Sequence, residues 1–187
     1  MNQLISVNKS KVELKEISCD AWETVKTFDR VYIGKNGFTK DKREGDMKTP
    51  LGLFKIGIAF STTDLNINYP CLKITENSYW VDDINSNFYN MWVEIGDIVA
   101  NYNYITSSDK ITWNSAEHLI DYPTEYEQGF VIEYNTDNRE KGKGSAIFFH
   151  VKDKDYTAGC IAVNKEDMEY ILNWLDKDKE PHILIEN

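Results

Sequence analysis

The stretch SAIFFHVKDKDYTAGCIAVNKEDM, residues 145–168, carries most of what this sequence predicts about fold and chemistry. It opens with an alternating segment in which Ala146, Phe148 and His150 share one face of a strand. A polar loop and a glycine turn then lead to Cys160, and an apolar segment runs on into a helix. We therefore expect a strand, a loop that reverses the chain, a second strand and a helix.

His150 and Cys160 are the residues in this stretch that can carry chemistry. Strand ends joined by such a loop lie side by side, which can bring an imidazole and a thiol within about 3 Å of each other. A free thiol has a pKa near 8.5, so an imidazole that takes its proton raises the reactive fraction. Spacing alone leaves a second interpretation open, in which His150 is structural and Cys160 is a small buried apolar residue.

Gly159 comes directly before Cys160 and lets the backbone turn without a Cβ in the way. The N–H groups of Gly159 and Cys160 would then point at a developing oxyanion, where preorganised donors can contribute about 10²–10³ in rate. The pattern predicts Cys160 as nucleophile, His150 as base and these two N–H groups as the oxyanion site.

The clearest predicted helix begins after Asn164, a good N-cap residue, with Glu166 and Asp167 in the first turn. Four apolar side chains then follow helical spacing and should face the core: Met168, Ile171, Leu172 and Leu175.

Strand patterns dominate the rest of the chain. They fall at residues 12–15, 30–34, 54–60, 71–75, 129–134, 145–151 and 182–185. Residues 77–126 have weak periodicity and predict a long excursion with one short helix. We expect a mainly β fold, a sandwich or partly closed barrel of antiparallel and mixed strands with the helix packed against it.

Length and charge limit the possibilities. The 187 residues fit one domain, 1–187, and the net charge of −10 makes a nucleic-acid partner improbable. Five basic residues lie close together and form either a solvated loop, the simpler interpretation, or a basic cleft: Lys35, Lys40, Lys42, Arg43 and Lys48. The three His and three Cys lack metal-ligand spacing, so no metal and no cofactor is expected.

Three cysteines leave at least one thiol free in a monomer, and a pairing of Cys19 with Cys71 stays open. The sequence has no apolar run of the ~18 residues that span a bilayer. Its first ten residues also lack a basic leader with an apolar stretch. Either the protein stays in the cytoplasm or a leader is missing from this chain.

The segment FFHVKDKDYTAGCIAV resembles the active-site signature of the L,D-transpeptidase catalytic domain (YkuD-like) family, a strand-borne His upstream of a Ser/Thr-x-Gly-Cys element. Upstream, GKNGFTKDKREGDMKTPLGLFKI resembles this family's glycine-rich approach to a Thr-Pro-x-Gly-x-Phe strand, here Thr49, Pro50, Gly52 and Phe54. Two motifs in the right order are more specific than either alone, and the resemblance covers most of residues 34–187.

The resemblance implies that Cys160 is the acylated nucleophile, His150 the base and Gly159 part of the oxyanion-binding turn. Thr157 matches the family's Ser/Thr, and we expect it to shape the turn and contact substrate. The implied activity is that of a peptidoglycan L,D-transpeptidase and carbapenem target, monomeric and extracytoplasmic or associated with the cell wall. It acts on tetrapeptide stem peptides and releases D-alanine while forming crosslinks. Two alternative functions stay open. One is an L,D-carboxypeptidase or endopeptidase, and the other is a wall-binding module without catalytic activity.

Departures from the family pattern concern the substrate pose. Ala158 stands where well-known members have a second His, Ala162 where they have Arg or Asn, and Val151 where they have Gly. A backbone carbonyl near Val151 is expected to orient His150, ahead of the side chains of Asp153 or Asp155. His118 and His182 are interpreted as structural, and the aromatic residues of 80–92 as packing.

Overall fold

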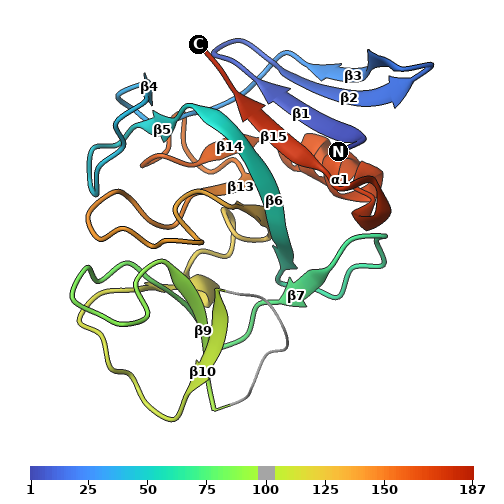
Figure 1. The fold of residues 1–187 in the computed structure, drawn as a ribbon. Coiled ribbons are helices and arrows are strands. Elements are labelled where there is room, and N and C mark those ends of the chain that lie inside the picture. Colours follow the sequence, from blue (N-terminus) through green and yellow to red (C-terminus); the bar gives the residue numbers. More distant parts are fainter. Residues whose placement is uncertain (97–103) are drawn as a thin grey trace.

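The computed structural model describes residues 1–96 and 104–187, and in them strands outnumber helices (Figure 1). The largest sheet has nine strands, ordered β14-β13-β12-β6-β15-β1-β2-β3, with β7 also paired to β6. Its strands are β1 (Gln3–Val7), β2 (Val12–Ser18), β3 (Ala21–Phe28), β6 (Gly52–Ser61), β7 (Cys71–Lys73), β12 (Gln128–Ile132), β13 (Phe148–Val151), β14 (Ile161–Val163) and β15 (His182–Ile185).

A second sheet of four strands has the order β10-β9-β8-β11. It comprises β8 (Ser78–Val81), β9 (Met91–Ile95), β10 (Ile105–Ser108) and β11 (Glu117–His118). A small parallel pair joins β4 (Phe38–Thr39) to β5 (Thr49–Pro50). The described helices are α1 (Lys165–Trp174) and two 3₁₀ turns, Leu119–Asp121 and Lys177–Lys179.

Both main sheets mix parallel and antiparallel pairs. In the large sheet β13 pairs with β14, and β1 with β15, in parallel, whereas β6 runs antiparallel to both β12 and β15. The predicted mainly β fold with mixed strands and a helix after the Cys160 strand is therefore confirmed. None of the described helices is long and apolar enough to cross a membrane.

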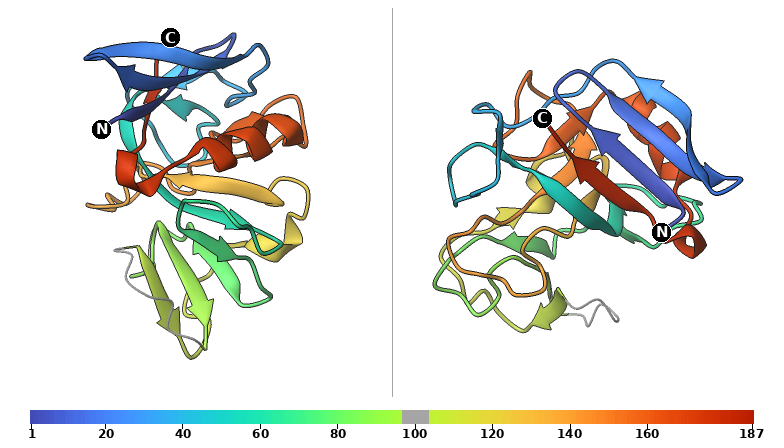
Figure 2. Two further views of the ribbon diagram at one scale, coloured as in Figure 1. Left: turned by 90° about the vertical axis from the view of Figure 1, so that its right-hand side faces the viewer. Right: turned by 45° about the horizontal axis from the view of Figure 1, so that its top comes forward.

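Two apolar clusters lie on opposite faces of the large sheet. In the left view of Figure 2, β1–β3 lie above α1 and the second sheet lies far below it. The helix buries its predicted face, Met168, Ile171, Leu172 and Leu175, in the first cluster. The second cluster joins the other face to the second sheet through Phe60, Trp80, Trp92, Tyr126 and Phe148. Tertiary burial of this kind is what stabilises a ten-residue helix.

Adjacent residues of β13 divide between the clusters. Phe149 packs with the helix side, and Phe148 packs with the second-sheet side. Since side chains alternate along a strand, His150 shares the second-sheet face with Phe148. Its ring meets Tyr126 edge to face with centroids 5.6 Å apart. The strand alternation predicted for residues 145–151 thus selects the side on which the imidazole lies.

Three predicted segments differ from the structure. Residues 30–34 form only isolated bridges, Tyr32 with Ala162 and Gly34 with Thr157, and no strand of their own. The strand predicted at 145–151 begins at Phe148, since Ala146 has a φ of +52°. The excursion at 77–126 contains one short 3₁₀ helix, Leu119–Asp121, in line with the predicted short helix, but its described part also holds the whole second sheet, which was not predicted. Residues 97–103 lie outside the described residues.

The second sheet escaped prediction because its strands do not alternate. In β8 every residue except one is buried, and the same holds for β9. Trp80 of β8 lies directly opposite Trp92 of β9. A strand buried on both faces loses the polar positions that mark a two-residue period.

Candidate active site

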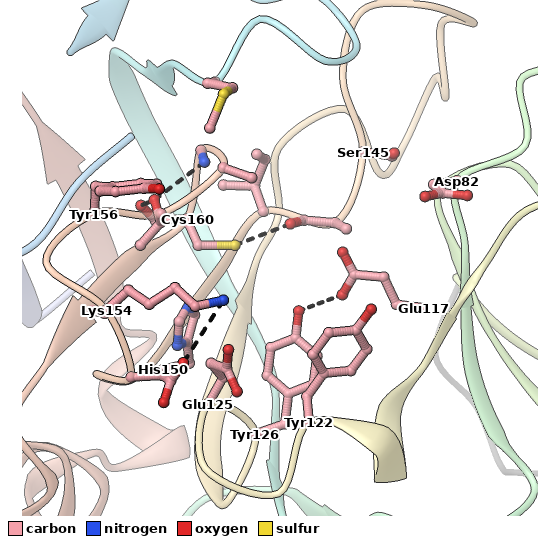
Figure 3. A pocket seen from close by; sticks show the side chains of 18 of the residues that line it. Asp82, Glu117, Tyr122, Glu125, Tyr126, Ser145, His150, Lys154, Tyr156 and Cys160 are labelled. Atoms are coloured by element: carbon pink, nitrogen blue, oxygen red, sulfur yellow. Dashed lines mark hydrogen bonds and ion pairs between the residues drawn. The ribbon is translucent and has the colours of Figure 1, made fainter. Parts of the chain in front are cut away.

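The two residues predicted to carry chemistry come from neighbouring strands. Cys160 lies immediately before β14, which pairs in parallel with β13 so that His150 faces Ala162. Both line a cavity of about 440 Å³, and Figure 3 shows them on the same side of it. The strands run parallel, so the predicted chain reversal is wrong: Cys160 lies just before the start of β14, and His150 lies further along β13, although both still line the same cavity.

Cys160 is buried, with 8% of its surface exposed. Its thiol donates to the Ala146 carbonyl at 3.2 Å, and its sulfur accepts from the Phe148 N–H at 3.3 Å. Burial raises the pKa of the thiol to about 12, and the Glu117 carboxylate adds to this effect, whereas the Phe148 N–H and the Lys42 ammonium oppose it. The thiol is therefore protonated at neutral pH.

The His150 ring is held by the protein backbone. Its Nδ1 lies 2.8 Å from the Val151 carbonyl oxygen, which confirms the expected orienting group. Because a carbonyl only accepts hydrogen bonds, Nδ1 carries the proton and Nε2 keeps its lone pair. Burial lowers the pKa of this imidazole to about 4, against smaller opposing effects of the Val151 carbonyl and the Asp153 charge. His150 is thus neutral at physiological pH and able to accept a proton.

Among the hydrogen bonds of the described residues, the Cys160 thiol is directed at Ala146 and not at His150. In enzymes without bound substrate, catalytic hydrogen bonds are often long or misaligned and tighten only in the complex. A rotation of the thiol away from the Ala146 carbonyl would be part of activation. The roles of nucleophile and base stay predictions.

The turn before Cys160 is held by two threonines. Thr157 Oγ1 donates to the Cys160 carbonyl at 2.6 Å and accepts from the Gly159 N–H at 3.1 Å, so the expectation that it shapes the turn is confirmed. Thr49 Oγ1 also donates to the Cys160 carbonyl, at 3.3 Å, and accepts from the Gly34 N–H. The two sequence motifs therefore meet at the backbone of Cys160.

Gly159 has a φ of +151°, and a Cβ there would lie 3.0 Å from the Lys48 carbonyl oxygen. The position thus requires glycine, as predicted. Its N–H, however, is occupied by Thr157 and is not the free donor that the sequence suggested. The oxyanion role of Gly159 and Cys160 stays a prediction, in which the Gly159 N–H would have to leave Thr157.

Three carboxylates that line the cavity are called the acidic wall: Asp82 and Glu117 lie across the cavity from Cys160, and Glu125 lies between His150 and Tyr126 in the view of Figure 3. The buried Tyr126 hydroxyl donates a hydrogen bond to Glu117 Oε2, and its ring lies against His150. Burial raises the pKa of Glu117 to about 7, and the neighbouring carboxylates add to this while the Tyr126 hydrogen bond opposes it. Glu117 therefore titrates near neutral pH, close to the thiol.

Replacing Glu117 by Gln is expected to stabilise the protein at pH 8 by about 1–3 kcal/mol more than at pH 5. The folded pKa of about 7 exceeds that of an unfolded Glu, so the folded state binds more protons. The free energy of unfolding that this carboxyl group contributes is therefore fully present below the pKa of an unfolded Glu. It is lost as the pH rises through 7. Urea unfolding of both proteins at the two pH values measures the difference.

The matched control is Glu169→Gln, at an exposed position of α1. Its effect should be small and nearly the same at both pH values. An equal effect of Glu117→Gln at pH 5 and pH 8 would contradict the raised pKa.

Several site residues were missed by the sequence interpretation. Tyr126 and Glu117 lie in the weakly periodic stretch, where no motif marks them, and the Ala146 carbonyl depends on backbone geometry alone. Lys42 was assigned to a solvated basic loop, which is wrong for this residue, because it is 4% exposed and lines the cavity. Its neighbours Lys40 and Arg43 are exposed, as that interpretation predicted.

The residues set aside from the site lie elsewhere. His118 stacks on Tyr79 with ring centroids 4.4 Å apart and contacts Asp121, and His182 bonds the Glu180 carbonyl. Trp80 and Trp92 are fully buried, which confirms their packing role. Cys19 and Cys71 are free thiols, so the pairing left open by the sequence is not formed.

Fold and cavity together define a mainly β domain with a buried thiol and a neutral imidazole on one cavity wall, an arrangement suited to cysteine acyl transfer. The chain belongs to the L,D-transpeptidase catalytic domain (YkuD) family, whose model matches residues 2–183. It is accordingly an L,D-transpeptidase-like domain of a family that acts on peptidoglycan.

Solved structures with the same fold are distant in sequence. The helical cell shape determining protein Pgp2 from Campylobacter jejuni is 16% identical with a TM-score of 0.56, covering 100% of this chain and 48% of Pgp2. Bd1075 from Bdellovibrio bacteriovorus is 15% identical with a TM-score of 0.53, covering 99% of this chain and 48% of Bd1075. This chain thus spans about half the length of either. Comparison with curated proteins gives no match.

Proposed function

We propose that this chain is a peptidoglycan L,D-transpeptidase that forms an acyl-enzyme on Cys160 from a tetrapeptide stem. The observation that carries the proposal is the shared cavity of Cys160 and His150, in which the imidazole is neutral and has its Nε2 lone pair free of the Val151 bond. Membership of the family supports the choice of peptidoglycan as substrate.

In the first half-reaction His150 Nε2 takes the thiol proton as the sulfur attacks the carbonyl carbon of the third stem residue. The tetrahedral intermediate collapses with cleavage of the C–N bond, and the imidazolium gives its proton to the leaving amine of D-alanine. Since the thiol has a pKa of about 12, proton removal has to accompany attack, and a preformed thiolate is not needed.

In the second half-reaction an amine of a neighbouring stem attacks the thioester. His150 accepts the proton of that amine, the C–S bond breaks and the sulfur leaves as a thiolate that is reprotonated by the imidazolium. The acidic wall supports transfer to an amine, because an incoming ammonium group is attracted by Asp82, Glu117 and Glu125 and releases one proton to solvent before the neutral amine attacks. Water in place of the amine would make the chain an L,D-carboxypeptidase.

Product analysis on isolated muropeptides tests the proposal. The native chain should release D-alanine from tetrapeptide stems and yield crosslinked dimers. Release of D-alanine with tripeptides as the sole other product would establish hydrolysis instead. Absence of both products, together with absence of a carbapenem adduct on Cys160, would favour a wall-binding module. We further propose an extracytoplasmic location, which cell fractionation can examine. We also propose a monomeric state, which light scattering can examine.

A further inference from the structure

We propose that Lys42 selects acyl donors by binding the free carboxylate of the leaving residue. The inference deepens the proposed function and rests on it. Lys42 lies in the loop between β4 and β5, and its side chain reaches the cavity from the side of the Cys160 turn. Only 4% of its surface is exposed, which is rare for a lysine and demands partners for its charge.

Two glycines make room for the Lys42 side chain. A Cβ on Gly144 would lie 2.8 Å from Lys42 Cγ, and a Cβ on Gly159 would lie 3.4 Å from Lys42 Nζ. The aliphatic part thus passes close to Gly144, and the ammonium lies next to the glycine that precedes the nucleophile. The position brings a positive charge to the turn where the oxyanion is expected to form.

Within the described residues, the Lys42 ammonium donates hydrogen bonds to two acceptors and has three N–H groups. It donates to Asp46 Oδ1 at 2.6 Å and to the Arg43 carbonyl at 3.1 Å. Asp46 is itself fixed by the backbone N–H groups of Arg43 and Lys48. The loop therefore holds the ammonium in one place and leaves it one donor for a ligand in the cavity.

Covalent geometry places a carboxylate within reach of this donor. Consecutive Cα atoms are about 3.8 Å apart, so the carboxylate of a terminal residue lies only a few ångströms from the scissile carbonyl oxygen. When that oxygen is at the Cys160 turn, the carboxylate is near Lys42. Asp82, Glu117 and Glu125 repel it elsewhere in the cavity, and the Lys42 ammonium offers it a hydrogen-bond donor next to the Cys160 turn, although Glu44 of the same loop also lines the cavity.

Two donors that differ at one group test this inference. One is a tetrapeptide stem with a free C-terminal carboxylate, and the other is the same peptide with a terminal carboxamide. For the native chain, kcat/KM for release of the last residue should be about 10- to 100-fold higher with the free acid, the range for a hydrogen bond to a charged group. In Lys42→Met and Lys42→Gln this ratio should fall to about one.

Lys48→Met is the matched control, since Lys48 belongs to the same loop but does not line the cavity, and it should keep the native ratio. A native ratio near one overturns the inference even if both Lys42 variants fail to fold. An undiminished ratio in a folded Lys42 variant overturns it as well and assigns Lys42 to loop structure. A native chain that cleaves neither donor instead overturns the proposed function on which the inference rests.

Discussion

Cys160→Ser is expected to lower the release of D-alanine from a tetrapeptide stem by at least about 10³-fold. The hydroxyl is a far weaker nucleophile than the thiol, and no second cysteine lines the cavity among the residues that the structure describes. The serine side chain fills nearly the same space as the cysteine side chain, so we expect Cys160→Ser to keep the native fold. Amino-acid release measures turnover, and intact-protein mass after exposure to a carbapenem reports the acyl-enzyme.

The matched control for this substitution is Cys71→Ser. Cys71 is a half-buried free thiol in β7 that does not line the cavity, and burial raises its pKa to about 11. The native chain and Cys71→Ser should each gain the mass of one carbapenem, and Cys160→Ser should gain none. An adduct on Cys160→Ser would show that a different residue is acylated.

His150→Gln should lower turnover by about 10²–10⁴-fold, the usual contribution of a general base. The native imidazole has a pKa of about 4 because of burial, so the active neutral form persists down to about pH 5 and is lost below it. The rate of the native chain should therefore fall as pH drops toward 4. The residual rate of His150→Gln should lack this acid limb. Turnover between pH 4 and 8 measures both.

His118→Gln serves as the control, because His118 contacts Asp121 and the Glu76 carbonyl and does not line the cavity. Its rate and acid limb should match those of the native chain. If His150→Gln kept the native acid limb, the group that titrates would be another residue, and His150 would not be the base.

Side-chain character and spacing along the chain predicted much of the large sheet. The alternation of residues 54–60 and 182–185 corresponds to β6 and β15, and the helical spacing from Met168 to Leu175 corresponds to the buried face of α1. These patterns are local, since each reflects one face of one element against the core. Local spacing in 145–168 suggested Cys160 and His150, and the resemblance of this stretch and of residues 34–56 to a known family made the proposal specific.

Contacts between segments that are distant in the sequence determine the surroundings of Cys160 in the cavity. Thr49 meets the Cys160 carbonyl across 111 positions, and Lys42 reaches Gly159 through space that two glycines leave open. Glu117 comes from β11 of the second sheet, and Tyr126 from the segment between the Leu119–Asp121 turn and β12, and neither position belongs to a periodic sequence pattern.

The sequence by itself therefore determined the mainly β class, the helix and the nucleophile and base that we propose, because these depend on local periodicity and on a motif. Only the tertiary structure decided the charge of the cavity walls, the protonation states of Cys160 and His150, and the direction of the thiol proton. Those properties depend on burial and on neighbours far away in the chain, and no local pattern encodes them.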